Sequence, residues 1–248
     1  MLNHPTLTQL DILGFAGMAT AFKELSSNPD ARALDHAEWL GLLLDREVTV
    51  RKDKRLKSRL RTAKLRFGQA CVEDIDLSPA RGIDKRLFHE LAGGNWIDEH
   101  QNLLLTGACG TGKTWLACAL AHKAARADRN VLYHRIPRLF AELALAHGDG
   151  RFPRLFRSLC KADLLLLDDL GPEPMTPSQR RDVLEILEER YGRGSTLITS
   201  QLPVASWFDI VGDPTMADAI LDRLVHNAHK IELKGDSLRK TKKGQNDE

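Results

Sequence analysis

"LLLTGACGTGKTW", residues 103–115, decides the fold, because an apolar run leads directly into a glycine-rich turn. Four residues separate Gly107 from the "GKT" at residues 112–114, which is the spacing of a phosphate-binding loop between a strand and a helix. Glycines adopt backbone angles that other residues resist, so the N–H groups of such a loop can point inward at a phosphate. The stretch therefore predicts a strand, a phosphate loop and a helix in succession.

Each polar residue of the loop has a chemical role in this reading. A helix that begins near Thr111 would direct its positive end at the phosphate. Lys113 would bring a positive charge to the outer phosphates, and the Thr114 hydroxyl is a hard oxygen that suits Mg²⁺. The alternative, a glycine-rich turn that binds nothing, explains the full spacing poorly. We expect ATP to contact Gly107, Ala108, Cys109, Gly110, Thr111, Gly112, Lys113, Thr114 and Trp115.

Composition narrows the class of protein. The 248 residues are 42% hydrophobic, enough for one large domain or for one medium and one small domain. No apolar run reaches the roughly 18 residues of a membrane span, and the first residues do not resemble a signal peptide. The four cysteines form no CxxC pair, which is typical of reduced thiols. We therefore expect a cytoplasmic protein that does not contact a membrane.

Charge is unevenly spread along the chain. Residues 51–66 hold nine Lys/Arg and one Asp, a local charge of +8, so the remainder carries −6 against a total of +2. Leu56, Leu60, Ala63 and Phe67 recur at helical spacing within this run, which predicts an amphipathic helix with a cationic face. Such a face suits the phosphate backbone of double-stranded DNA, although a merely solvated helix face is the alternative. The predicted DNA-contacting residues are Arg51, Lys52, Lys54, Arg55, Lys57, Arg59, Arg61 and Lys64.

The order of elements predicts an α/β fold preceded by a small all-α domain. Residues 1–70 look helical, with an apolar stripe at Ala33, Ala37, Leu40 and Leu44. Strands and helices then alternate, which favours a parallel sheet flanked by helices. The expected strands are 102–106, 131–134, 163–167, 195–200 and 230–233, and the expected helices are 115–125, 137–146, 176–191 and 215–226. The expected domains are a helical, basic DNA-binding and assembly domain at 1–70, a connector at 71–98, the ATPase at 99–234 and a flexible basic tail at 235–248.

Two carboxylates complete the expected nucleotide site. Asp168 and Asp169 follow the buried run "LLLL", and charges at the carboxyl end of a strand in such a sheet point into the ligand crevice. The first can hold Mg²⁺, and the second can polarise a water for attack on the terminal phosphate. Ser200 and Gln201 end the next strand and could position that water. The alternatives are acidic and polar residues that simply end strands.

Arg223 lies on the last predicted helix. It fits an arginine finger for a neighbouring subunit as well as it fits an exposed helix arginine or a local partner of Asp222.

These motifs together resemble the AAA+ ATPases, in the branch of the DnaC-type helicase loaders and the IstB-like ATPases of insertion sequences. The resemblance covers nearly the whole chain. "RLKSRLRTAKL" and "GIDKRLFHELAGGNWI" favour the IstB side. The motifs that carry the core resemblance are "GACGTGKTW", "ADLLLLDDLG", "TLITSQLPVASW", "ILDRLVH" and "GDSLRK".

The resemblance implies a P-loop AAA+ ATPase that hydrolyses ATP with Mg²⁺. It further implies ATP-dependent assembly into a homo-oligomer on DNA, and assistance to a transposase by selecting or remodelling target DNA. Arg223 would be the arginine finger and Arg239 a second phosphate-sensing arginine, although too few residues follow Leu233 for a full helical lid. Cys109 is an unusual residue in the loop. The alternatives are a replicative helicase loader and a DNA-binding module that uses ATP only structurally, which the two carboxylates disfavour.

Overall fold

The computed structural model describes residues 4–171 and 173–238, and the chain divides into two compact units. The first unit ends at Ser58 and the second begins at Arg59. This division lies within the helix His36–Ala63 (α3). The sequence had suggested a boundary later in the chain, at residue 70. No helix among the described residues is long and apolar enough to cross a membrane.

The first unit is helical, as predicted. It contains α1 (Pro5–Ile12), α2 (Ala16–Ser27), a 3-10 turn (Pro29–Ala33) and most of α3. Gly17 of α2 lies against the α3 backbone, where a Cβ would stand 2.6 Å from Glu47 Cα. The Glu47 carboxylate is buried and accepts hydrogen bonds from the N–H groups of Gly17 and Met18 at 2.7 and 3.1 Å.

This contact selects the buried face of α3. Leu43 and Glu47, four residues apart, are buried, whereas Leu40 and Leu44 are each 49% exposed. The predicted stripe through Leu40 and Leu44 was therefore wrong in its phase. Apolar residues occupy several faces of this helix, so spacing alone did not select the face that packs. The close approach at Gly17 does.

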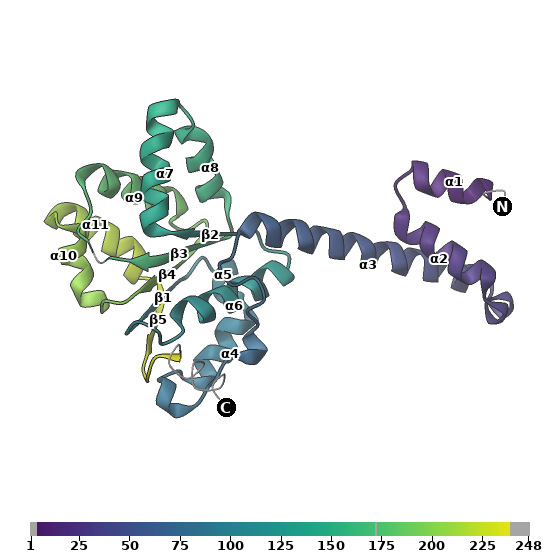
Figure 1. The fold of residues 1–248 in the computed structure, drawn as a ribbon, viewed down its shortest axis with the longest axis horizontal. Helices are drawn as coiled ribbons and strands as arrows, with labels where there is room; N and C mark the ends of the chain where they lie inside the picture. Colours follow the sequence, from purple (N-terminus) through teal and green to yellow (C-terminus); the bar gives the residue numbers. More distant parts are fainter. Residues whose placement is uncertain (1–3, 172, 239–248) are drawn as a thin grey trace, which may run out of the picture. The chain divides into compact units, whose positions relative to one another are not determined.

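A five-stranded, fully parallel sheet forms the centre of the second unit, which confirms the predicted fold class (Figure 1). Its strand order is β2-β3-β4-β1-β5. The strands are β1 (Asn102–Gly107), β2 (Val131–Arg135), β3 (Leu164–Leu170), β4 (Ser195–Ser200) and β5 (Ala228–Leu233). In such a sheet all carboxyl ends share one edge, so the end of β1 lies near those of β3 and β4.

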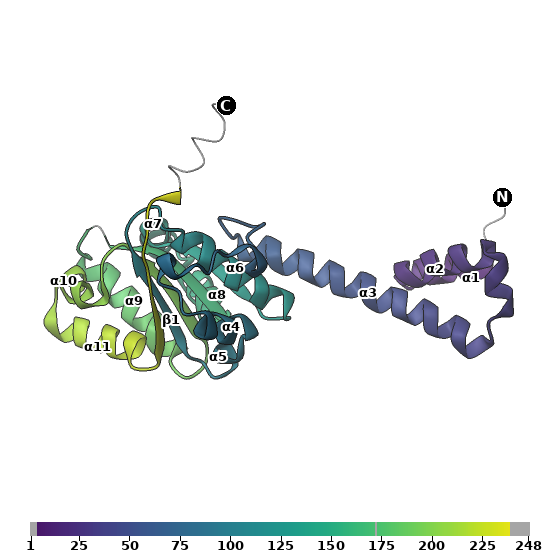
Figure 2. The same ribbon diagram turned by 90° about the horizontal axis from the view of Figure 1, so that it is seen from below.

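Helices cover both faces of this sheet (Figures 1 and 2). Helix α6 packs on one face, and α7, α9 and α11 pack on the other. Leu104, Leu165 and Ile198 belong to the apolar core beneath this second group. The helices are α4 (Lys85–Gly93), α5 (Asn95–Asp98), α6 (Lys113–Arg126), α7 (Ile136–Asp149), α8 (Phe152–Lys161), α9 (Pro177–Arg190), α10 (Trp207–Val211) and α11 (Pro214–Val225).

Four of these helices were not expected from the sequence. Helices α4 and α5 lie in the segment read as a connector, and α8 and α10 lie in segments read as loops. Helix α7 ends at Asp149, its C-cap Gly150 has a φ of 77°, and α8 begins already at Phe152. Asp84 caps α4 by accepting hydrogen bonds from the N–H groups of Arg86 and Leu87. Of these four helices, only α4 has a side-chain cap at its start.

Candidate nucleotide site

The phosphate loop has the backbone that its glycines predicted. Gly107, Gly110 and Gly112 have φ of 138°, 86° and 88°. A Cβ on Gly107 would stand 2.2 Å from the carbonyl oxygen of Leu233, so only glycine fits there. Helix α6 begins at Lys113, slightly later than the expected start near Thr111.

Lys113 is held by its own loop. Its side chain is mostly buried, and its Nζ donates to the carbonyl oxygens of Gly107 at 2.7 Å and Ala108 at 2.8 Å. An incoming phosphate would replace these carbonyls, because a charged ammonium binds an anion more strongly than a neutral oxygen. All nine residues predicted to contact ATP lie in this loop and the first turn of α6.

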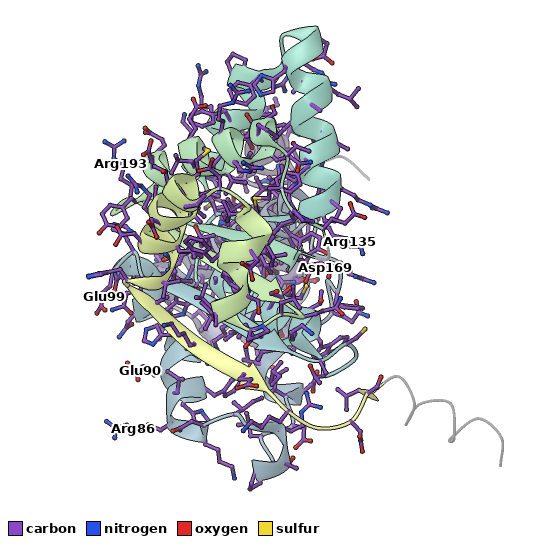
Figure 3. The ribbon with its side chains drawn as sticks, turned by 90° about the vertical axis from the view of Figure 1, so that its left-hand side faces the viewer. Arg86, Glu90, Glu99, Arg135, Asp169 and Arg193 are labelled. Atoms are coloured by element: carbon purple, nitrogen blue, oxygen red, sulfur yellow. The ribbon has the colours of Figure 1, made fainter. Side chains whose placement is uncertain are left out.

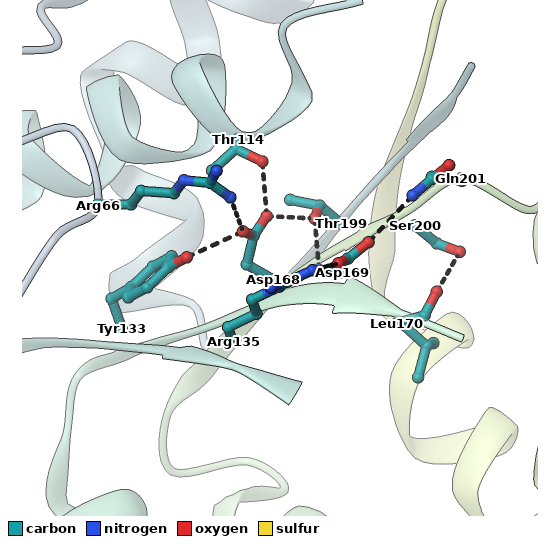
Figure 4. A network of polar contacts seen from close by, with 10 residues as sticks. All are labelled: Arg66, Thr114, Tyr133, Arg135, Asp168, Asp169, Leu170, Thr199, Ser200 and Gln201. Carbon is teal, nitrogen blue, oxygen red and sulfur yellow. Dashed lines mark hydrogen bonds and ion pairs between the residues drawn. The ribbon is translucent and has the colours of Figure 1, made fainter. Parts of the chain in front are cut away.

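The structure brings the two predicted Mg²⁺ ligands together (Figure 4). The Thr114 hydroxyl donates to Asp168 Oδ1 at 2.8 Å. Asp168 is 1% exposed, and it also accepts from Thr199 Oγ1 at 2.6 Å and from the Tyr133 hydroxyl at 2.9 Å. Hydroxyl and carboxylate oxygens suit Mg²⁺, which usually completes its coordination with substrate phosphates and water. Among the described residues, no group of three or more His, Cys, Asp or Glu side chains could hold a metal ion.

Asp169 lies at an irregularity in the sheet. The register of β3 against β4 shifts between Leu167 and Leu170, and Asp169 has a φ of 68°. Arg135 donates to Asp169 Oδ2, with Nη2 at 2.7 Å and Nε at 3.1 Å, and Gln201 donates to Oδ1 at 3.2 Å. Burial raises the pKa of Asp169, but hydrogen bonds from Arg135 and Gln201 outweigh it and bring the pKa below its usual value. The carboxylate is therefore ionised near neutral pH, as a group that polarises water requires.

The two polar residues at the end of β4 lie in different places. Ser200 is fully buried, and its hydroxyl donates to the carbonyl oxygen of Leu170 and accepts from the Leu202 N–H. Gln201 contacts Asp169. The structure thus places Gln201 next to Asp169, whereas the Ser200 hydroxyl contacts Leu170 instead (Figure 4).

Among the strand residues of this network, sequence reasoning missed three: Tyr133, Arg135 and Thr199. Each lies at or near the carboxyl end of a strand that neighbours β3. Burial and Asp168 raise the pKa of Tyr133, so its hydroxyl remains protonated and donates. The polar "YHR" at residues 133–135 was a usable signal, but only with the knowledge that β2 pairs with β3.

Arg223 lies at the opposite end of the strands, near the amino ends of β1 and β4. It borders a cavity of about 280 Å³ together with Asn102 at the start of β1 and Thr196 near the start of β4. Its Nη2 contacts Glu188 Oε1 at 2.9 Å. Figure 3 shows Glu99, which also borders this cavity, far from Arg135 and Asp169. Arg223 therefore does not reach the phosphate loop of its own chain, and Arg239 lies outside the described residues.

The predicted DNA-contacting cations lie on α3, apart from Lys64, which follows its last residue. Two of them already have partners. Arg51 contacts Glu47 Oε1 at 2.6 Å, and Arg59 contacts Asp128 Oδ1 at 2.6 Å. Lys52, Lys54, Arg55, Lys57, Arg61 and Lys64 are exposed. The predicted apolar stripe leaves the helix before Phe67, because Lys64 has a φ of 51°.

Known proteins are similar to this chain in sequence and in fold. The family model of the IstB-like ATP binding protein matches residues 8–246. The insertion sequence ATP-binding protein y4pL of Sinorhizobium fredii is 60% identical over 243 residues, covering 98% of this chain and 99% of that protein. The IS21 ATP-binding protein of Pseudomonas aeruginosa is 35% identical over 208 residues, covering 84% of this chain and 78% of that protein.

Solved structures show the same core. The crystal structure of DnaI has a TM-score of 0.57 at 25% identity and covers 68% of this chain and 90% of that one. AMPPCP-bound DnaA from Aquifex aeolicus has a TM-score of 0.56 at 18% identity, covers 71% of this chain and 55% of that one, and shows the likeness of fold. With the phosphate loop and the acidic pair in place, these matches establish that the chain belongs to the family of IstB-like ATP-binding proteins and is an AAA+ ATPase.

Proposed function

We propose that this ATPase assembles on double-stranded DNA as an ATP-dependent homo-oligomer and assists a transposase by selecting or remodelling target DNA. One observation carries the proposal: a single chain joins a nucleotide site to the cationic run 51–66. The names of its relatives support the context, because they assign those proteins to insertion sequences, and mobile DNA moves by means of a transposase.

The residues of the nucleotide site divide the chemistry among them. Lys113 binds the outer phosphates, and Thr114 and Asp168 would hold Mg²⁺, which neutralises charge on the phosphates. Asp169 accepts a proton from the attacking water, and Gln201, which donates to Asp169 at 3.2 Å, orients that water. Ser200 would position Gln201 indirectly, because its hydroxyl contacts Leu170 and Leu202 and so holds the turn that contains Gln201. ATP is thus hydrolysed to ADP and phosphate.

Arg223 would serve the nucleotide of a neighbouring subunit. It lies at the opposite sheet edge from its own phosphate loop, so an assembly would have to bring another chain's γ-phosphate to it. Such an arrangement makes turnover depend on assembly. Arg239 remains a candidate for a second phosphate contact.

The cationic run would hold the DNA backbone. Its lysines and arginines neutralise phosphates and release counterions, so affinity should fall steeply with salt and depend weakly on sequence. A variant should therefore replace cations that have no role inside the protein. Lys52, Lys54, Arg55 and Lys57 are exposed, unlike the partly buried Arg59, and Arg51 is excluded because it contacts Glu47.

The test is duplex binding by fluorescence anisotropy across a salt series, with and without ATP. Replacing these four residues with Ala should weaken binding to every sequence and reduce the log–log salt slope by up to about 0.9 per lost phosphate contact. Equal slopes would show that the run is only a solvated face, with Arg151 and Arg154 as the next candidates. A control variant removes four other exposed cations: Lys23, Arg32, Lys85 and Arg86.

A replicative helicase loader is a second candidate, because the fold resembles DnaI and the DnaC helicase loader. Capture of a hexameric helicase instead of the transposase would favour it. A module that uses ATP only structurally would bind ATP without releasing phosphate, so a steady-state phosphate assay separates it from both.

A further inference from the structure

Arg66 is the last cation of the run 51–66, and it points into the nucleotide site. Its Nη1 lies 3.9 Å from Asp168 Oδ2 (Figure 4). Its guanidinium stands over the Phe67 ring, 5.5 Å from the ring centroid. None of the roles assigned above uses it. A cation from the DNA-binding run therefore contacts the carboxylate that would hold Mg²⁺.

Packing anchors the backbone beside Arg66, whereas the Arg66 side chain is partly exposed. Phe67 packs against Trp115 with ring centroids 5.3 Å apart, and Ala70 and Cys118 are buried in the same apolar cluster. Trp115 directly follows Thr114, so this turn is anchored to the part of α6 that carries a predicted Mg²⁺ ligand. The Arg66 side chain is 45% exposed, which leaves it room to swing.

Arg66 and Mg²⁺ would compete for the carboxylate of Asp168. Asp168 is buried, and the three hydrogen-bond donors around it, from Thr114, Thr199 and Tyr133, are neutral hydroxyls. A buried carboxylate gains from a countercharge, and Arg66 supplies one. A divalent ion at the same carboxylate supplies a larger positive charge and repels the guanidinium. Asp168 therefore favours Arg66 or Mg²⁺, and each weakens the binding of the other.

We propose that Arg66 is a displaceable countercharge for Asp168: it pairs with this carboxylate without nucleotide and is released to a DNA phosphate when Mg²⁺ and ATP bind. The inference rests on the proposed function, since it requires nucleotide at Asp168 and DNA on the run 51–66. Released Arg66 adds one cation to those already exposed on this run. Nucleotide binding then raises DNA affinity, and by linkage DNA raises the affinity for Mg²⁺ and ATP to the same degree.

The first test measures Mg²⁺ without turnover or DNA. A fluorescent ATP analogue is titrated with Mg²⁺ on the wild type and on Arg66→Gln. Loss of the competing charge should tighten Mg²⁺ binding by about two- to fivefold, the range of a partly exposed ion pair. Arg66→Lys should stay near the wild type. Unchanged or weaker Mg²⁺ binding in Arg66→Gln would overturn the competition.

Arg126→Gln is the matched control. Arg126 is 43% exposed, close to the 45% of Arg66, and pairs with Glu73 at 3.6 Å on the far end of α6. Its loss removes one charge and one ion pair without touching Asp168, so the Mg²⁺ dependence should not change. An equal effect from both variants would mean that net charge, and not the contact with Asp168, is responsible.

The second test measures DNA. In the wild type, Mg²⁺ with a non-hydrolysable ATP analogue should steepen the log–log salt slope of duplex binding by about 0.9, one phosphate contact. Arg66→Gln should show no such change. If the wild type binds no DNA, the proposed function fails, and the Mg²⁺ titration still decides the contact. If both proteins show the same nucleotide-dependent change, the proposed release of Arg66 fails alone.

Discussion

Arg190 ties three elements of the ATPase unit together from a buried position. It is the last residue of α9 and is 1% exposed. Its Nη1 donates to the carbonyl oxygens of Leu159 at 2.8 Å and Ala162 at 2.7 Å, and its other nitrogens contact Ser195 and Thr196 in β4. Burial lowers the pKa of Arg190 to about 10, which still leaves it charged at neutral pH.

Replacing Arg190 with Met keeps much of the aliphatic volume but removes every donor. A buried acceptor that loses its partner costs about 1–3 kcal/mol. Two effects reduce the total cost of these unpaired acceptors. The buried charge and its desolvation are gone, and water from the adjoining cavity of about 280 Å³ can pair with some carbonyls. Several acceptors lose their partner, so we expect Arg190→Met to lower the free energy of unfolding by about 3–5 kcal/mol.

Urea unfolding followed by circular dichroism measures this loss. Arg193→Met is the control, because the Arg193 side chain is 71% exposed and its contact with Glu189 is a surface pair worth about 0–1 kcal/mol. Both variants should keep the wild-type m-value, which is the slope of the unfolding free energy against urea concentration. A loss below about 1 kcal/mol in Arg190→Met, equal to that of Arg193→Met, would refute the view that these hydrogen bonds hold α8, α9 and β4 together.

Four further changes test the site and its surroundings. Lys113→Ala should weaken binding of a fluorescent ATP analogue by at least about tenfold, about 1.4 kcal/mol, and unchanged affinity would contradict the phosphate loop. Asp169→Asn should still bind ATP while phosphate release falls by about 10²–10⁴-fold, and normal turnover would reject its role. Arg223→Ala mixed with Asp169→Asn should recover some turnover at mixed interfaces, whereas full activity of isolated Arg223→Ala chains would exclude a finger. Burial lowers the pKa of His134, although the nearby charge of Glu142 opposes this shift. The unfolded chain therefore binds a proton at this residue more readily than the native state does, so stability should decline as pH falls below about 6.5. Thermal unfolding from pH 7 to 5 should show a shallower decline in His134→Gln, and parallel curves would assign the effect elsewhere.

The phosphate loop could be predicted from the sequence because its determinants are local. Gly107, Gly110 and Gly112 dictate their own backbone, and the order of strand, loop and helix puts Lys113 and Thr114 at a helix start. The parallel sheet followed in the same way from the alternation of strands and helices. The family match confirms the resemblance carried by these motifs.

The surroundings of the acidic pair depend on strand order. Tyr133, Arg135 and Thr199 reach Asp168 or Asp169 only because β2 and β4 flank β3. Alternation along the chain predicts that strands exist but not which ones are neighbours. Arg66 likewise meets Asp168 through a turn packed on α6, at a separation that no local pattern encodes.

The sequence by itself therefore determined the backbone of the phosphate loop, since glycine backbone freedom and helix starts act over a few positions. Tertiary structure alone decided which face of α3 is buried, because the close approach of Gly17 to Glu47 selects Leu43 over Leu40. It also decided which side chains surround the carboxylates of Asp168 and Asp169. Side-chain hydrogen bonds form only within about 3 Å, and packing between distant segments sets those distances.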